Sequence, residues 1–383
     1  MNLPINNSEQ LKKQSQKKGV ENRLASLDIL RGFDMFWIIG GDALILSIIS
    51  YLGWSFLEPV VGNFKHSKWI GFTAYDLIFP LFIFISGVAM PFSFEKYLMS
   101  QQKRSLYFRV IKRAVILIFL GFLYNGILKT LDFANLRYLS VLGLIGLAYL
   151  WASIVVMNFK PIGQAVFAAA ILIVYAVMMN FIPVPGFGGG VLTPEGNFAS
   201  FIDRHIVPGK LIYGVHDPEG VLMTFPASVL AIAGALAGAL LKKQNLGRYR
   251  KVLFLAAAGV ICLGIGIFWG RDFPMIKKLW TSSFVIYTVG WSLLLLAVFY
   301  LIVDVWGIRK AFFPFMLIGL NPITIYICAH GVIDFGYMAR FFFGGLIRIA
   351  EEPLRAVILW SGILVCELIF LYILYRKKIF LKV

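Results

Sequence analysis

The sequence predicts an all-α fold: a polytopic integral membrane protein with about ten transmembrane helices and cytoplasmic N- and C-termini. Of its 383 residues, 60% are hydrophobic and 14% are charged, and the mean hydropathy is +0.82. Soluble domains carry about 25% charged residues. The apolar residues gather in runs close to the ~20 residues that cross a bilayer. Lysines and arginines concentrate between alternate runs, the pattern that the positive-inside rule describes.

Each apolar run is predicted to be a helix, because only a helix satisfies its own backbone polar groups in lipid. The predicted spans are 33–52, 72–92, 110–128, 138–157, 163–183, 222–241, 252–270, 283–303, 313–331 and 354–375.

The basic residues also set the predicted orientation and domain boundaries. Residues 1–31 are polar and basic, with Lys12, Lys13 and Arg23 among them, and are expected to form a cytoplasmic segment before one transmembrane domain, 32–383. The net charge of +17 is then a topology signal rather than a sign of nucleic-acid binding. The expected location is a cell inner membrane, with the lipid bilayer as the surrounding medium.

Several kinds of chemistry have no support in the sequence. Cys262, Cys328 and Cys366 lie inside apolar runs without a CxxC pair, so neither disulfides nor a thiolate metal site are expected. There is no P-loop, HExxH, GxSxG or Rossmann fingerprint. We therefore expect no metal and no ATP-driven transport.

Three extracytoplasmic loops are expected to hold the function. They span 53–71, 184–221 and 271–282, and they carry charged, aromatic and glycine-rich stretches rather than short turns. His66 lies where the first of these loops meets the second span. A histidine there is able to take a proton from an amine near neutral pH; the alternative is an interfacial ring that is merely solvated.

Two acidic residues accompany His66. Asp42 lies roughly 10 Å deep in the first span, given the ~1.5 Å rise per helical residue, and a buried carboxylate needs a partner. That partner is His66, a cationic substrate, or a lysine or arginine of another helix. Asp76 comes early in the second span, where a structural helix cap competes with a role at the site.

Later spans hold further polar candidates. Asn321 is suited to bonding an adenine or amide group, or to bridging helices, and His330 ends the ninth span. Trp280 and Ser282 open the eighth span, where the serine also suits an N-cap.

Gly234 and Gly238 form a GxxxG pair. Such a pair suits close helix packing, either within one chain or in a homodimer. The sequence leaves these two alternatives open.

The sequence resembles the heparan-α-glucosaminide N-acetyltransferase family of transmembrane acyltransferases along nearly the whole chain. The similar segments, in order, are Arg23–Gly32, His66-x-x-Trp69-x-Gly71, Asp76-Leu77-x-Phe79-Pro80, Ile182–Gly186, Asp217–Gly220, Leu279–Ser282 and Tyr375–Phe380. The short basic N-terminus favours a bacterial relative.

The resemblance implies transfer of an acetyl group from cytoplasmic acetyl-CoA, a co-substrate, across the membrane to the amine of a glucosamine-type sugar. It places the catalytic histidine at His66. A family asparagine falls on Asp42, where an acid would hold His66 in one tautomer. A family Gln-Arg pair falls on Gly143-Leu144, a departure for which Arg137 is the candidate substitute.

The residues expected to serve this reaction fall into three groups. The catalytic pair is His66 and Asp42. The residues expected to bind acetyl-CoA are Arg31, Trp280, Ser282, Asn321, His330, Lys377 and Lys378. The residues expected to bind the sugar are Asp76, Asp217, Glu219 and Arg137.

Two other functions stay open at this stage. One is a permease for an amino sugar or its acetylated form, in which Asp42 binds the ammonium group and no CoA takes part. The other is an O-acyltransferase acting on envelope polysaccharide with the same histidine base.

Overall fold

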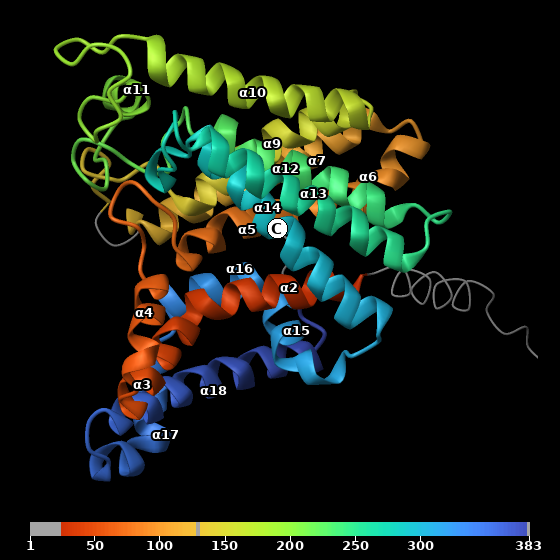
Figure 1. The fold of residues 1–383 in the computed structure, drawn as a ribbon. Coiled ribbons are helices and arrows are strands. Elements are labelled where there is room, and N and C mark those ends of the chain that lie inside the picture. Colours follow the sequence, from red (N-terminus) through yellow and green to blue (C-terminus); the bar gives the residue numbers. More distant parts are fainter. Residues whose placement is uncertain (1–23, 128–130, 381–383) are drawn as a thin grey trace, which may run out of the picture.

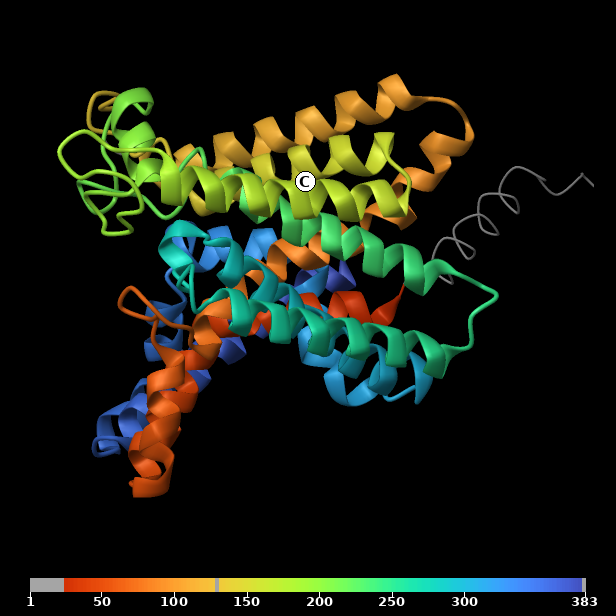
Figure 2. The same ribbon diagram turned by 45° about the horizontal axis from the view of Figure 1, so that its top comes forward.

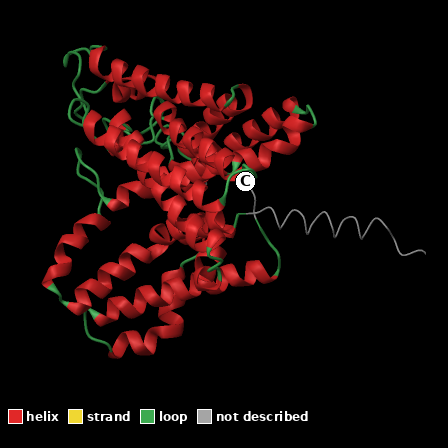
Figure 3. Cartoon of the chain, turned by 45° about the vertical axis from the view of Figure 1, so that its right-hand side comes forward, coloured by secondary structure: helices red, strands yellow, loops and turns green. Residues whose placement is uncertain are grey.

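A computed structural model describes residues 24–127 and 131–380. Arg23 and most of the basic N-terminal segment 1–31 lie outside the described residues. Within them the fold is all-α, and connecting loops join the helices without a named strand (Figure 3). Isolated backbone bridges pair Arg137 with Gly209 and Val184 with Gly188.

The helices run back and forth, so their connections gather at two ends of the bundle (Figure 1). We call the end that holds the loops around 53–73, 131–140, 182–223 and 270–281 the loop end, and the other the short-turn end. The first half of the chain forms α2 (Ala25–Phe36), α3 (Asp42–Leu52), α4 (Glu58–Val61), α5 (Ile78–Val88), α6 (Met90–Met99), α7 (Lys103–Tyr124), α9 (Val141–Asn158) and α10 (Pro161–Phe181). The second half forms α11 (Phe198–Ile206), α12 (Thr224–Lys242), α13 (Arg248–Trp269), α14 (Ser282–Phe299), α15 (Phe313–Leu320), α16 (Pro322–Ile327), α17 (Phe335–Ile349) and α18 (Leu354–Arg376).

Eight helical segments of the described chain are long and apolar enough to cross a membrane, and a bent pair makes a ninth if it counts as one span. The chain is therefore a multi-pass membrane protein. These numbers agree with the prediction of about ten transmembrane helices. The segment predicted at 110–128 overlaps α7 up to Tyr124, and its residue 128 lies outside the described residues. The first half of α7 carries Lys103, Arg104, Arg109, Lys112 and Arg113, so this helix is too basic to meet the same standard.

The span predicted at 313–331 is not one straight helix. It breaks between Leu320 and Pro322, and the two halves meet at 69°. Pro322 has no backbone N–H to continue the ladder of hydrogen bonds, and Asn321 at the break adopts a non-helical conformation. The break turns α16 and the π-helical segment Cys328–Val332 away from the line of α15.

Helix α5 lies at the centre of the bundle, packed closely against α12. A Cβ on Gly234 would overlap the carbonyl oxygen of Phe84, and a Cβ on Gly238 would overlap that of Val88. The GxxxG pair therefore packs inside the chain, which is the first of the two alternatives that the sequence left open.

A second group of helices projects from this bundle at the loop end. Helix α3 leans away from α2, because Gly40 lies in a non-helical conformation inside the π-helical segment Trp37–Gly41, with a φ of 124°. Helices α3 and α17 both pack against α18 and extend together from the main bundle (Figures 1 and 2). The kink at Gly40 thus separates two parts of the first span.

Candidate active site

The candidate catalytic histidine, His66, lies in a loop that is hydrogen-bonded to two other loops. Trp69 donates its indole N–H to the carbonyl oxygen of Leu192 at 2.9 Å. The amide of Gly71 donates to the carbonyl oxygen of Met275, also at 2.9 Å. Gly71 has a φ of 124°, which favours glycine. The segment that carries His66 is therefore held by two other loops of the loop end.

His66 pairs with Asp76. Its Nδ1 atom lies 2.9 Å from Oδ1 of Asp76, and the His66 side chain is 50% exposed while the carboxylate is fully buried. When Nδ1–H donates to Asp76, Nε2 keeps its lone pair and is able to act as a base; the Lys277 Nζ atom lies 3.4 Å from it. A buried carboxylate behind a half-exposed imidazole is the arrangement that orients a histidine for proton transfer.

The Asp76 carboxylate is held in place by the turn that starts α5. It accepts hydrogen bonds from the amides of Ser67 and Thr73 at 3.2 and 3.1 Å, and from the Thr73 hydroxyl at 3.1 Å. Thr73 and Asp76 together form a capping box for the helical turn Ala74–Leu77. Asp76 therefore combines the capping role and the site position that the sequence weighed as alternatives.

Lys277 is the third member of this centre. Its Nζ lies 2.8 Å from His66 Nδ1 and 3.4 Å from Asp76 Oδ1. Burial lowers the pKa of Lys277, although the nearby Asp76 opposes this shift. Lys277 lies in the predicted outer loop 271–282, and the sequence assigns it no role. Only the fold brings it beside His66.

Asp42 is not the carboxylate that contacts His66. Its Oδ1 accepts the amide of Ala43 at 2.7 Å, and its side chain is hydrogen-bonded to Tyr75. The Tyr75 ring in turn lies 4.8 Å from the His66 ring, centroid to centroid. The idea that Asp42 fixes the His66 tautomer is thus replaced by direct contact with Asp76, because Asp42 lies one residue past the kinked segment and behind Tyr75.

The predicted sugar-binding residues Arg137, Asp217 and Glu219 form a separate buried cluster. Arg137 donates to both oxygens of Asp217 at 2.8 and 2.6 Å and also bonds Glu219. Burial opposes ionisation of Asp217, yet the Arg137 hydrogen bonds hold its pKa below the usual range. Burial, reinforced by the Asp217 charge, raises the pKa of Glu219 to about 7. One guanidinium, that of Arg137, thus balances two carboxylates, so Glu219 keeps its proton more readily than Asp217 does.

The residues predicted to bind acetyl-CoA divide between the two ends of the bundle. At the loop end, Trp280 donates to the carbonyl oxygen of Pro218 at 3.0 Å, and Ser282 donates to that of Leu172 at 2.7 Å. Both side chains are buried, so these bonds tie loops and helices together. The Ser282 hydroxyl thus already donates its proton within the protein.

The remaining members of that group lie elsewhere. Arg31, on α2, bonds Asp28 at 3.2 Å, and Lys377 and Lys378 follow α18 at the short-turn end. Asn321, at the break between α15 and α16, donates to the carbonyl oxygen of Ile379 at 3.0 Å. His330 lies in the π-helical segment that follows α16, with Nδ1 3.1 Å from the carbonyl oxygen of Tyr326.

A cavity of about 710 Å³ adjoins the His66 centre. It lies among the π-helical segments Trp37–Gly41 and Cys328–Val332, the start of α17 and the middle of α18. Its lining includes Asp42, Tyr75, His330 and Glu367. Glu367 was not among the predicted site residues, although a glutamate in the middle of an apolar span is itself a signal of a functional position.

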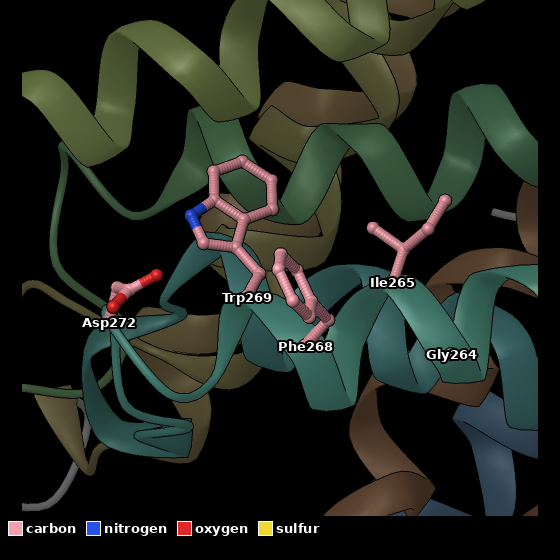
Figure 4. Close-up of a pocket in the computed structure, with 5 residues that line it drawn as sticks. All are labelled: Gly264, Ile265, Phe268, Trp269 and Asp272. Carbon is pink, nitrogen blue, oxygen red and sulfur yellow. The ribbon is translucent and has the colours of Figure 1, made fainter.

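Two other hollows differ in character. An apolar crevice of about 50 Å³ lies between α2, α5, α9 and α16, and Ile38 lines both this crevice and the large cavity. A hollow of about 470 Å³ on the outer side of α13 is lined by Ile265, Phe268 and Trp269, with Asp272 just beyond the helix (Figure 4). Ile265 and Phe268 are largely exposed there, as expected of lipid-facing surface.

Comparison with known proteins gives two kinds of match. Residues 23–181 match a family described as "Domain of unknown function (DUF5009)". A protein of Mus musculus named heparan-alpha-glucosaminide N-acetyltransferase is 27% identical over 422 aligned positions, covering 95% of this chain and 62% of its own length. The Homo sapiens protein of the same name is 27% identical over 420 positions, covering 94% of this chain and 60% of its own.

The chain is thus similar over nearly its whole length to two proteins named heparan-alpha-glucosaminide N-acetyltransferase. This agrees with the resemblance seen in the sequence motifs. The chain spans about three fifths of the length of these two acetyltransferases. The matched domain 23–181 includes His66 and Asp76 but ends before Lys277 and Glu367.

Proposed function

We propose that the protein is an acetyl-CoA-dependent N-acetyltransferase that acts on the amine of a glucosamine-type sugar at the loop end of the bundle. The observation that carries the proposal is the contact of half-exposed His66 with buried Asp76 at 2.9 Å. The relatives named heparan-alpha-glucosaminide N-acetyltransferase support the reaction class. In this proposal the loop end faces outward from a cell inner membrane and the short-turn end faces the cytoplasm.

The geometry supports His66 as the general base. Asp76 accepts Nδ1–H, so Nε2 is free to take a proton from the amine as its nitrogen attacks the thioester carbonyl carbon. A carbon–nitrogen bond forms, the carbon–sulfur bond breaks, and the imidazolium returns the proton to the departing CoA thiolate. The ion pair between Lys277 and Asp76 keeps the carboxylate in place during this exchange.

The donor substrate would reach His66 from the opposite side of the bundle. Arg31, Lys377 and Lys378 supply positive charge near the short-turn end, where phosphates are bound well by lysine and arginine. An apolar crevice of about 50 Å³ lies between the helices, and Ile38 lines both this crevice and the cavity beside Tyr75. In this proposal the thioester arm passes between these helices, which must move apart to admit it.

The test is the variant His66→Ala, purified in lipid nanodiscs and assayed with radiolabelled acetyl-CoA and glucosamine. We expect transfer to fall by about 10²–10⁴-fold, the usual contribution of a general base, while acetyl-CoA binding measured by calorimetry stays unchanged. His205→Ala is the matched control, because His205 lies in α11 and its ring bonds only the carbonyl oxygen of Phe201 among its hydrogen-bond contacts in the described chain.

Near-normal transfer by His66→Ala would refute the role of His66. Failure of the wild-type protein to bind acetyl-CoA would exclude both the N-acetyltransferase and the O-acyltransferase functions. In that case uptake of the sugar, measured in proteoliposomes, becomes the function to test.

A further inference from the structure

The cavity beside Tyr75 is built from irregular helix. The π-helical segments Trp37–Gly41 and Cys328–Val332 both contribute to its wall, and α18 contributes Trp360, Ile363 and Glu367. Single π turns inside helices are frequently found at functional sites. A volume of about 710 Å³ lies in the usual range of ~300–1,000 Å³ for small-molecule sites.

The charged side chains that line this cavity are acidic. Its lining holds the carboxylates of Asp42, Asp334 and Glu367 together with the imidazole of His330, and neither lysine nor arginine is among the residues that line it. The rest of the lining is apolar, aromatic or glycine. Such a wall favours a cation over an anion.

Two of the three carboxylates already have partners. Asp42 is bonded to the amide of Ala43 and to Tyr75. Asp334 caps α17 by accepting the amide of Tyr337 at 2.8 Å. Each of these two carboxylates therefore has at least one hydrogen-bond donor from the protein.

Glu367 differs from them. It is 1% exposed, it lies midway along the membrane-spanning helix α18, and its Oε2 atom has no hydrogen-bond partner in the described part of the chain. An unpaired carboxylate at such a depth is costly and calls for a partner. Because Glu367 lines the cavity, a bound cation is able to supply that partner.

We propose that this cavity binds the protonated amine of the acceptor, with Glu367 as its principal counter-ion and Asp42 as the second carboxylate. The identity of the amine as the acetyl acceptor rests on the function proposed above. The rings of Trp360 and Tyr75 provide the apolar surface on which a sugar ring packs. The site takes primary ammonium compounds and discriminates against their neutral N-acetylated products.

Tyr75 joins this cavity to the catalytic centre. It lines the cavity, bonds Asp42, and places its ring 4.8 Å from that of His66. An amine that contacts Asp42 is therefore separated from the His66 ring by one side chain, that of Tyr75. An ammonium ion loses two protons in this reaction: one leaves to solvent before the nitrogen attacks, and His66 takes the second and passes it to the departing CoA thiolate. The neutral product carries no charge to pair with Glu367, so its release follows.

The experiment measures sugar binding without acetyl-CoA. Wild-type protein in nanodiscs is titrated with glucosamine and, separately, with N-acetylglucosamine, and the same titrations are made with Glu367→Gln and Asp42→Asn. We expect Glu367→Gln to weaken glucosamine binding by about tenfold or more, because the amide does not carry the negative charge that pairs with the ammonium group. Asp42→Asn should give a smaller loss, and binding of N-acetylglucosamine should stay within about twofold.

Glu351→Gln is the matched control, because Glu351 is an exposed glutamate just before α18. In the transfer assay Glu367→Gln should raise the KM for glucosamine and leave the KM for acetyl-CoA unchanged. Equal glucosamine affinity in wild type, Glu367→Gln and Asp42→Asn would overturn the proposal while leaving the catalytic role of His66 intact. Conversely, glucosamine binding that depends on Glu367 in a protein without transferase activity would support this site and refute the proposed reaction.

Discussion

The centre of His66, Asp76 and Lys277 and the cluster of Arg137, Asp217 and Glu219 lie at the same end of the bundle, and each combines positive charge with carboxylates. In the cluster, all three side chains are largely buried and bond one another. In the centre, one ring is half-exposed while its carboxylate is fully buried. The difference teaches that two clusters of similar charge expose their side chains differently. The cluster balances its charges inside the protein, whereas the centre presents a half-exposed ring held by a buried carboxylate, which is why the proposed reaction uses the centre.

The first prediction tests the centre and carries the largest expected effect. Asp76→Asn should lower acetyl transfer by about 10²–10³-fold, because an amide no longer fixes Nδ1–H and stabilises the imidazolium less. The measurement is the rate of acetyl transfer per folded protein, with Asp272→Asn, an exposed aspartate of a neighbouring loop, as the control. A variant that stays folded and keeps more than half the wild-type rate would contradict the comparison.

The second prediction tests the cluster as a structural element. Arg137→Met leaves two buried carboxylates without their counter-ion and should destabilise the protein by about 3–5 kcal/mol. The fraction of molecules that remain folded in detergent during heating reports the change, and Arg250→Met, at an exposed position, is the control. If Arg137→Met remained as stable as wild type but lost transfer, the cluster would belong to the reaction rather than to the scaffold.

The third prediction concerns pH and has the smallest expected effect. Burial raises the pKa of Glu219 from its ordinary 4.5 to about 7, so between these two values the folded protein binds more protons than the unfolded chain. Stability should therefore fall as pH rises from 4.5 to 7. Glu219→Gln should remove this decline, which we expect to amount to roughly 3 °C in the melting temperature. An identical decline in both proteins would assign the pH dependence to another group.

The candidate site was predictable in part. His66 stood out because histidine is scarce in this chain and this one lies where a loop meets a span. Its partner was harder to assign: Asp42 and Asp76 were both plausible, and only the turn from Thr73 to Leu77 shows which carboxylate faces the ring. Lys277 is 211 residues from His66 along the chain, a separation over which sequence patterns carry no distance information.

The membrane helices were likewise predictable only in part. The span predicted at 354–375 coincides closely with α18, because an uninterrupted apolar run in lipid has only one way to satisfy its backbone. The break at Asn321-Pro322 was visible as a residue pair, but not as a 69° bend. The angle depends on how α15 packs against α2 and α18.

The sequence by itself determined that this protein is a helical membrane protein, where most of its spans lie, and that His66 is the leading candidate for proton transfer. Apolar run length and the scarcity of polar groups within lipid suffice for those conclusions. The tertiary structure alone decided that Asp76 and Lys277 surround His66, that Arg137 serves Asp217 and Glu219, and that Glu367 lines a cavity beside Tyr75. Those contacts arise where kinked helices and long loops meet, and the free energy of such contacts depends on positions in space rather than on spacing along the chain.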